Sequence, residues 1–232
     1  MSVKRIVIHS EIVYGMAILM LSFAVAMMTA ADFGVSMIVA PAYILSRKFA
    51  FLTFGQCEAI LQSFVFVIFC ILMKGIKLVY FSSFLTCLFY GAALDFWRRV
   101  IPLFNPAITP PGSMAPVLRV LFLAAGMVLT ALSVAFFFRT YLYPQVYDFF
   151  VKGISAHFHK DRTKFKIIFD MSCLLAAVIM TLIFFGRFVG VGAGTFIMAA
   201  GNGLLIGRLG QLLDKYILIC PYAKKLAVRF EF

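Results

Sequence analysis

The sequence has few charged residues for its length. Asp, Glu, Lys and Arg make up 13% of its 232 residues, whereas an ordinary soluble domain has about a quarter. Only nine residues are acidic, while apolar residues reach 64% and the mean hydropathy is +1.04. This composition excludes an ordinary soluble domain and is typical of a chain embedded in lipid.

Motifs that carry catalysis or bind metal are missing as well. The sequence has no P-loop, no HExxH motif and no CxxC pair. The five cysteines lie in or beside apolar segments, where cysteine behaves as a small buried hydrophobe. His157 and His159 lie in a basic loop without a fourth metal ligand nearby. We therefore expect no catalytic residues, no metal and no cofactor, and we predict that the protein is not an enzyme.

The charge that is present is mainly basic and gives a net charge of +12. Lys and Arg occur in short clusters between long apolar runs, which is the pattern that the positive-inside rule produces in membrane proteins. No basic face with interleaved aromatic residues lies outside the apolar runs. The lipid bilayer is therefore the expected partner, and nucleic acid is not.

Long apolar runs predict six transmembrane helices, because a span needs about 20 mostly apolar residues. These six segments cover residues 12–31, 55–73, 78–96, 117–138, 167–186 and 189–213. The first run is too long for a signal-peptide core, so we expect it to be a retained helix. Two further segments, 34–46 and 140–157, are predicted to be short or broken helices. The fold class is thus an all-α polytopic transmembrane helical bundle.

The chain resembles itself across a Pro-rich linker at residues 100–116. Residues 15–24 read GMAILMLSFA and residues 126–135 read GMVLTALSVA, with five identities at one spacing. With the spacing lengthened by one residue, Glu58 falls opposite Asp170. We therefore predict two pseudo-symmetric halves of about four segments each, a first transmembrane repeat at 1–99 and a second at 117–232. Such repeats are common in transporters.

The two short segments decide the topology. If both cross the membrane and the N-terminus is inside, eight passes leave 17 Lys and Arg inside and four outside. If neither crosses, six passes leave 15 inside and six outside. The positive-inside rule favours eight passes, which makes the halves parallel, whereas six passes make them inverted.

A glycine-rich string at residues 186–195 admits three interpretations. A dinucleotide-binding fingerprint needs GxGxxG between a strand and a soluble helix, but here the third glycine is displaced and the flanks are apolar. Gly186, Gly190 and Gly194 form a small-xxx-small ladder that lets helices approach closely, as do Ala199, Gly203 and Gly207. Alternatively, the glycines break a helix, so that its backbone groups line a site, as in transporters.

Intramembrane acids are the other candidates for function. A carboxylate in hydrocarbon needs a partner or water, at a cost of at least about 2.5–3.5 kcal/mol. Glu58 has no cation within a turn, and Gln62 lies one turn along the same face. Asp170 has Lys166 four residues before it. Glu58 and Asp170 are predicted either to face each other and bind a cation or carry protons, or to sit near helix ends as capping, solvated residues.

Two other acids have cations on their own helix face. Arg98 and Arg99 follow Asp95 by three and four residues, and Lys152 follows Asp148 by four, which are the spacings of helical ion pairs. Asp148 nevertheless lies well inside its segment and remains a candidate. The predicted solute- or ion-binding residues are Glu58, Gln62, Asp148, Asp170, Gly190, Gly192, Gly194, Thr195 and Asn202.

Three strings together resemble the YitT/YczE-type bacterial membrane proteins. These are GVGAGT at 190–195, ADFGVS at 31–36 followed by Pro41, and LTFGQ at 52–56. The resemblance covers nearly the whole chain. It implies a multi-pass protein of the bacterial inner (cytoplasmic) membrane without an established catalytic site, often regarded as a transporter. We expect both termini in the cytoplasm.

The first functional hypothesis is a transporter of a small solute, coupled to protons or a cation through Glu58 or Asp170. The alternatives are a substrate-binding membrane subunit of a multi-component transporter and a non-catalytic membrane scaffold. The small residues Ala24, Ala26, Ala30 and Ala31 of the first helix suit docking on another helix, so a homo-oligomer or a partner subunit is also considered.

Overall fold

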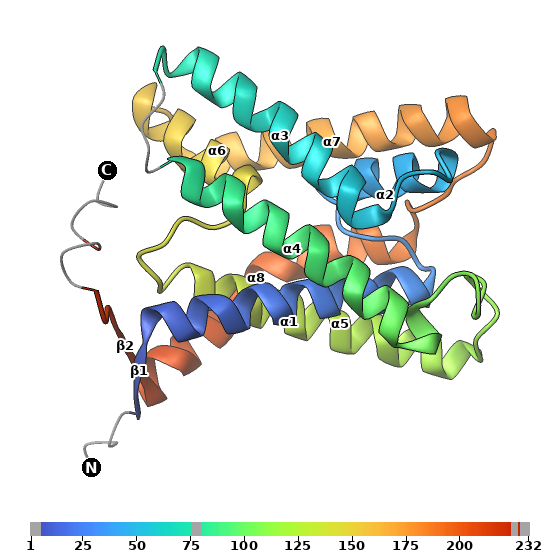
Figure 1. Ribbon diagram of the computed structural model, residues 1–232, viewed down its shortest axis with the longest axis horizontal. Helices are drawn as coiled ribbons and strands as arrows, with labels where there is room; N and C mark the ends of the chain where they lie inside the picture. Colours follow the sequence, from blue (N-terminus) through green and yellow to red (C-terminus); the bar gives the residue numbers. More distant parts are fainter. Residues whose placement is uncertain (1–5, 76–79, 224–226, 228–232) are drawn as a thin grey trace.

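Each of the eight segments predicted from the sequence folds as an α-helix in the computed structural model, which describes residues 6–75, 80–223 and 227 (Figure 1). Within these residues the chain also forms a 3-10 helix and two short strands. The elements in order are β1 (Ile6–His9), α1 (Ser10–Ala31), α2 (Ala40–Lys48), α3 (Phe54–Leu72), α4 (Phe81–Val100), η2 (Pro102–Phe104), α5 (Pro116–Phe137), α6 (Val146–His157), α7 (Arg162–Phe185), α8 (Ala193–Tyr216) and β2 (Ile217–Cys220).

Local signals in the sequence explain several helix ends. Thr53 and Gln56 form a capping box at the start of α3: the backbone N–H of Gln56 donates to Thr53 Oγ1 at 3.1 Å, and that of Thr53 donates to Gln56 Oε1 at 2.9 Å. Asp161 caps α7 by accepting from the backbone N–H of Lys164 at 2.8 Å. Gly186 ends α7 in the left-handed conformation, with a φ of +64°.

Five helices, α1, α3, α5, α7 and α8, are long and apolar enough to cross a membrane. The sixth expected span, α4, has 20 residues but carries Asp95, Arg98 and Arg99 near its end. The strands β1 and β2 pair in parallel, so α1 begins and α8 ends on the same side of the bundle. An even number of crossings would fit that pairing, and α4 is long enough to be the sixth.

The helices α2 and α6 are too short to cross. They have nine and 12 residues, which at 1.5 Å per residue span about 14 and 18 Å against a hydrocarbon core of about 30 Å. Figure 1 shows α2 near the end of the bundle where α1 finishes and α6 near the end where α1 begins. An eight-pass, parallel arrangement would need both of these short helices to cross, and α1 and α5 run in opposite directions (Figure 1), so the described structure does not support it.

The helix packing relates the two halves of the chain. Helix α1 packs on α5 and α4, and α5 also packs on α8. The two short helices share the same neighbours, because α2 and α6 each pack on α3 and α7. If each helix of the first half is replaced by its counterpart in the second half (α1 by α5, α2 by α6, α3 by α7, α4 by α8) and the reverse, the same set of pairs results. Two pairs depart from the pattern: α3 packs on α4 and α4 packs on α6, whereas no comparable contact joins α7 with α8 or α8 with α2 in the described part of the chain.

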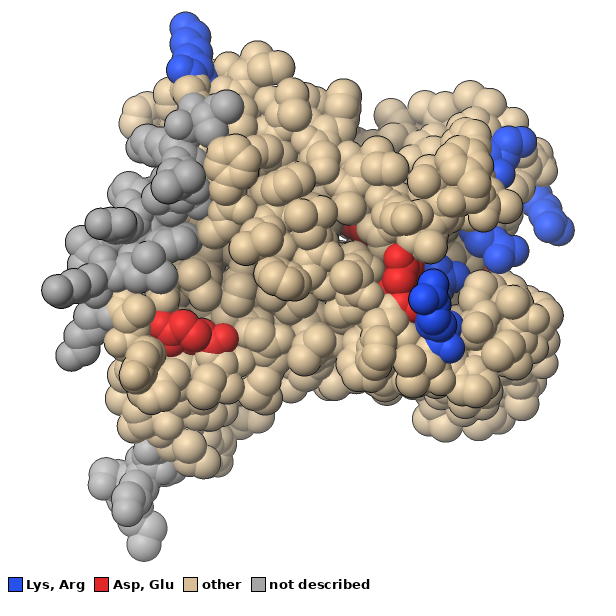
Figure 2. Space-filling model, viewed as in Figure 1, with Lys and Arg blue, Asp and Glu red and all other residues tan. Residues whose placement is uncertain are grey.

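The surfaces of the bundle fit a membrane. On the face shown in Figure 2, most of the charged side chains lie towards the two ends of the bundle, and the surface between them is largely uncharged. The centre is formed by α1, in which Ala24, Ala26 and Ala31 are fully buried. A Cβ on Gly126 of α5 would lie 3.3 Å from the Ala24 carbonyl oxygen. Three of the four alanines considered for docking a partner thus pack inside this chain, and only Ala30 is partly exposed.

Candidate functional site

Glu58 lies on the second turn of α3 with 0% of its surface exposed. Gln62, one turn further, donates from Nε2 to Glu58 Oε2 at 3.1 Å, which confirms that the two lie on one helix face. Gln62 Oε1 accepts from the backbone N–H of Val146 at 3.2 Å. Val146 is the first residue of α6. Gln62 therefore links a buried carboxylate to the N-terminus of a half-length helix.

Three buried polar atoms at this junction have no hydrogen-bond partner among the described residues. They are Glu58 Oε1, Gln145 Nε2 and the Tyr147 hydroxyl. Gln145 and Tyr147 flank Val146 in the sequence, and the Tyr147 hydroxyl lies close enough to act as a hydrogen-bonding group for the Glu58 carboxylate, although the pair falls outside the geometry of a regular hydrogen bond. Buried polar groups are almost always satisfied by protein, water or a ligand. The junction thus presents one acceptor and two donor groups that a small bound species can satisfy.

The surroundings of Glu58 contain no compensating cation. Tyr90 and Cys87 of α4 are buried within electrostatic range of its carboxylate. Within the described ranges, no Lys, Arg or His nitrogen forms an ion pair with Glu58. A charged carboxylate in this position is costly unless a proton, a cation or water compensates it. The arrangement can therefore hold a proton or a small cation.

Asp170 belongs to a different cluster. Lys166 lies 3.6 Å from Asp170 and 3.1 Å from Asp148, so one ammonium group bridges two carboxylates. The expected partner of Asp148, Lys152, is thereby corrected to Lys166. Cys173 of α7 lies within electrostatic range of both Asp170 and Glu58, but the two acids do not contact each other. Each acid has one buried oxygen without a hydrogen bond in the described structure, Glu58 Oε1 and Asp170 Oδ1, but Asp170 has a cation beside it and Glu58 has none.

The glycine string forms a loop rather than a continuous ladder. Gly186 ends α7, Gly190 lies in the loop with a φ of +76°, and α8 begins only at Ala193, four residues after the expected start. The predicted ladder Gly186/Gly190/Gly194 is therefore not on one helix. Thr195 is buried, and its Oγ1 accepts from the backbone N–H of Gly192 at the start of α8 at 3.2 Å.

This loop packs backbone to backbone against residues 33–35. The N–H of Val35 donates to the Gly190 carbonyl at 3.0 Å, and the N–H of Gly194 donates to the Phe33 carbonyl at 2.8 Å. A Cβ on Gly192 would lie 2.6 Å from the Phe33 carbonyl oxygen. Gly190, Gly192, Gly194 and Thr195 thus join the chain after α1 to the start of α8. This favours the packing interpretation over a substrate site.

The remaining residues of α8 stand apart from Glu58. The Oδ1 atom of Asn202 is buried without a partner in the described structure, and no contact links it to the junction at α6. Ala199, Gly203 and Gly207 are exposed, and a Cβ on Gly203 or Gly207 would meet nothing within 4 Å. Their ladder faces away from the bundle.

Sequence reasoning missed Gln145, Tyr147 and Tyr90. One feature of the sequence could have pointed to them. The short segment around Pro144 is too polar for a transmembrane span and too apolar for a solvated loop, which indicates a short helix inside the bundle. A helix that starts inside a bundle places its first residues next to the neighbouring helices. Which neighbour those residues meet depends on the packing of α3 against α6, which the sequence does not specify.

One comparison with known proteins gives a match. Residues 8–211 match a family model described as "Family of unknown function (DUF6198)". Neither a curated protein nor a solved structure shows significant similarity to the chain. The resemblance to the YitT/YczE-type proteins stays a prediction.

Proposed function

We propose that this chain, which belongs to the family of unknown function DUF6198, is a membrane transporter of a small solute in which Glu58 binds a proton or a cation. The observation that carries the proposal is the fully buried Glu58 carboxylate, whose Oε1 has no partner in the described structure. Ionisable groups are kept inside a membrane chiefly where they serve an ion or proton pathway.

The half-length helices support this proposal. Transporters commonly place their sites at discontinuous helices, because a helix N-terminus within the bundle offers free N–H groups and a partial positive charge. Gln62 connects Glu58 to the first N–H of α6. When Glu58 gains a proton or a cation, its bond with Gln62 changes, and Gln62 in turn holds α6. Occupancy of Glu58 is thereby coupled to the position of α6.

The charge distribution supports an orientation. Six passes place 15 Lys and Arg on the side of the termini and six on the other, so the positive-inside rule puts both termini in the cytoplasm. In this proposal the two halves are inverted repeats, each with three crossing helices and one short helix. The membrane is the bacterial inner membrane that the resemblance implies.

A pH jump on a solid-supported membrane tests the role of Glu58 without knowledge of the solute. The wild-type protein should give a transient charge movement when the solution is acidified, because protons enter the buried site. Glu58→Gln removes the titrating group and should abolish the transient. Asp214→Asn is the matched control, because Asp214 is exposed and paired with Arg139. An undiminished transient in Glu58→Gln would contradict the proposal.

A further inference from the structure

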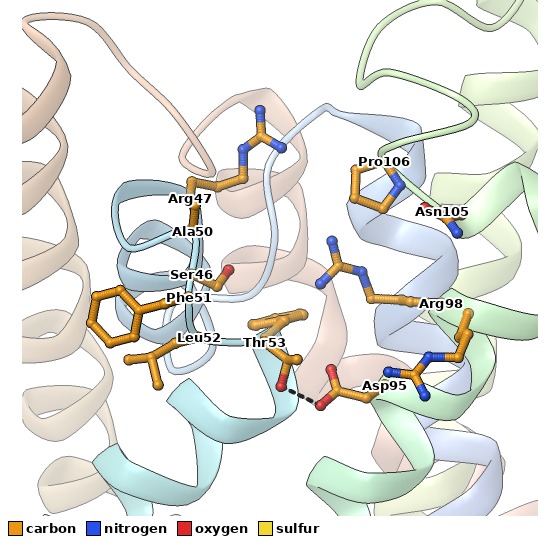
Figure 3. Close-up of a pocket in the computed structure, with 12 residues that line it drawn as sticks. Ser46, Arg47, Ala50, Phe51, Leu52, Thr53, Asp95, Arg98, Asn105 and Pro106 are labelled. Atoms are coloured by element: carbon orange, nitrogen blue, oxygen red, sulfur yellow. Dashed lines mark hydrogen bonds between the residues drawn. The ribbon is translucent and has the colours of Figure 1, made fainter.

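A separate pocket opens at the end of the bundle away from β1 and β2. It encloses about 300 Å³ and lies where the end of α2, the start of α3, the end of α4 and the segment after η2 meet (Figures 1 and 3). Three arginines, Arg47, Arg98 and Arg99, line it together with one acid, Asp95. The titratable side chains of the lining thus carry three positive charges against one negative.

The carboxylate of Asp95 forms no direct ion pair with these arginines in the described structure. Its Oδ1 accepts from the backbone N–H of Gly55 at 2.9 Å, and its Oδ2 accepts from the Thr53 hydroxyl (Figure 3). Both oxygens therefore bind the N-terminus of α3. The helical ion pairs expected between Asp95 and Arg98 or Arg99 are absent from the described structure. The prediction was wrong because Asp95 finds better-placed donors on the neighbouring helix.

Arg98 has no acidic partner within 4 Å in the described structure, and Asp95 acts on it only from a longer distance. Its guanidinium group lies over the Phe54 ring, 5.2 Å from the centroid, and its Nε is buried without a hydrogen-bond partner. In Figure 3 Arg98 extends towards the middle of the pocket and Arg47 lies nearer its rim. Among the described residues, neither Arg47 nor Arg99 has an acidic partner within 4 Å. A partly buried guanidinium is compensated best by an oxyanion, which can accept two N–H groups at once.

We propose that this pocket binds an oxyanion, a phosphate or carboxylate group, through Arg98 and Arg47. The volume admits a small anion or the phosphate of a lipid headgroup, and the excess of positive charge concentrates anions at the mouth. The stacked, preorganised guanidinium of Arg98 supplies the planar donor fork, and Arg47 adds charge from the opposite wall. This pocket is separate from Glu58, so the proposal of an oxyanion site does not depend on whether the chain transports protons.

The test uses the full-length protein in nanodiscs, with thermal unfolding as the readout and inorganic phosphate as the probe. In discs of phosphatidylcholine alone, phosphate should raise the unfolding temperature in a saturable manner. Arg98→Gln and Arg47→Gln should each weaken the apparent affinity about tenfold, because each removes a charge-assisted contact. Arg98→Lys keeps the charge and the fold but loses the planar fork, so it should also bind more weakly. Arg187→Gln is the control, because Arg187 is exposed and does not line the pocket.

Discs that contain phosphatidylglycerol distinguish the two sources of the oxyanion. Stabilisation by phosphate in the neutral discs, lost in the pocket variants, identifies a soluble anion. Stabilisation only by phosphatidylglycerol, lost in the same variants, identifies a lipid headgroup. No stabilisation by either, or an equal loss in Arg187→Gln, overturns the proposal.

Discussion

Replacing Gly34 with alanine should cost about 2–5 kcal/mol of folding free energy and leave little folded protein. Gly34 has a φ of +96°, which side chains with a Cβ rarely adopt. A Cβ there would lie 2.6 Å from the backbone nitrogen of Gly192 and 2.5 Å from Thr195 Oγ1. The substitution therefore combines backbone strain with a clash against a chain segment that cannot easily move.

The matched control is Gly203→Ala. Gly203 lies in α8, and a Cβ there would meet nothing within 4 Å. Alanine also favours a helix more than glycine does, so this variant should be at least as stable as the wild type. Fluorescence-detected size-exclusion chromatography and thermal unfolding in detergent measure both variants. Equal yields and unfolding temperatures would show that the contact between residues 33–35 and 190–195 does not hold the bundle together.

Replacing Gln62 with leucine should destabilise the protein by about 3–5 kcal/mol. The substitution removes the donor to Glu58 Oε2 and the acceptor for the N–H of Val146. Both partners then remain buried without a hydrogen bond, which costs more than the bonds themselves contribute. Denaturant or thermal unfolding in detergent measures the loss.

Two comparisons make this prediction specific. Gln211→Leu removes an exposed glutamine from α8 and should be close to neutral. The double variant Glu58→Leu with Gln62→Leu should recover part of the loss, because it no longer leaves a carboxyl group without its partner. A double variant less stable than Gln62→Leu alone would argue that Glu58 is satisfied by groups other than Gln62.

Apolar length predicted the positions of the helices well. All eight helical segments were found from local sequence, because helix formation and burial in lipid depend on nearby residues. The capping box at Thr53 and Gln56 is a further local signal. The number of crossings is less local. Charge counts favoured eight passes, whereas α2 and α6 are shorter than the hydrocarbon core, so six passes fit the helix lengths better. The strands β1 and β2 are more than 200 residues apart in the sequence, and no local sequence pattern predicts that they pair.

Only the local part of the candidate site was predicted from the sequence. The spacing of Glu58 and Gln62 on one helix is local and was found. The Lys166 bridge between Asp148 and Asp170 depends on the packing of α6 against α7 and replaced an expected pair within α6. Asp95 likewise bonds to a neighbouring helix instead of to Arg98. Contacts between residues on different helices depend on tertiary packing, and the pattern of residues in a single sequence does not predict which helices pack together.

The most direct test of the central claim is labelling with dicyclohexylcarbodiimide, which modifies protonated carboxyl groups in apolar surroundings. Peptide mass spectrometry of the labelled protein in liposomes should show modification at Glu58 that declines as the pH is raised, with little at the exposed Asp161 and Asp214. That result would place a proton-binding carboxyl group inside the bundle. Labelling of the exposed acids with an unmodified Glu58 at every pH would contradict the account.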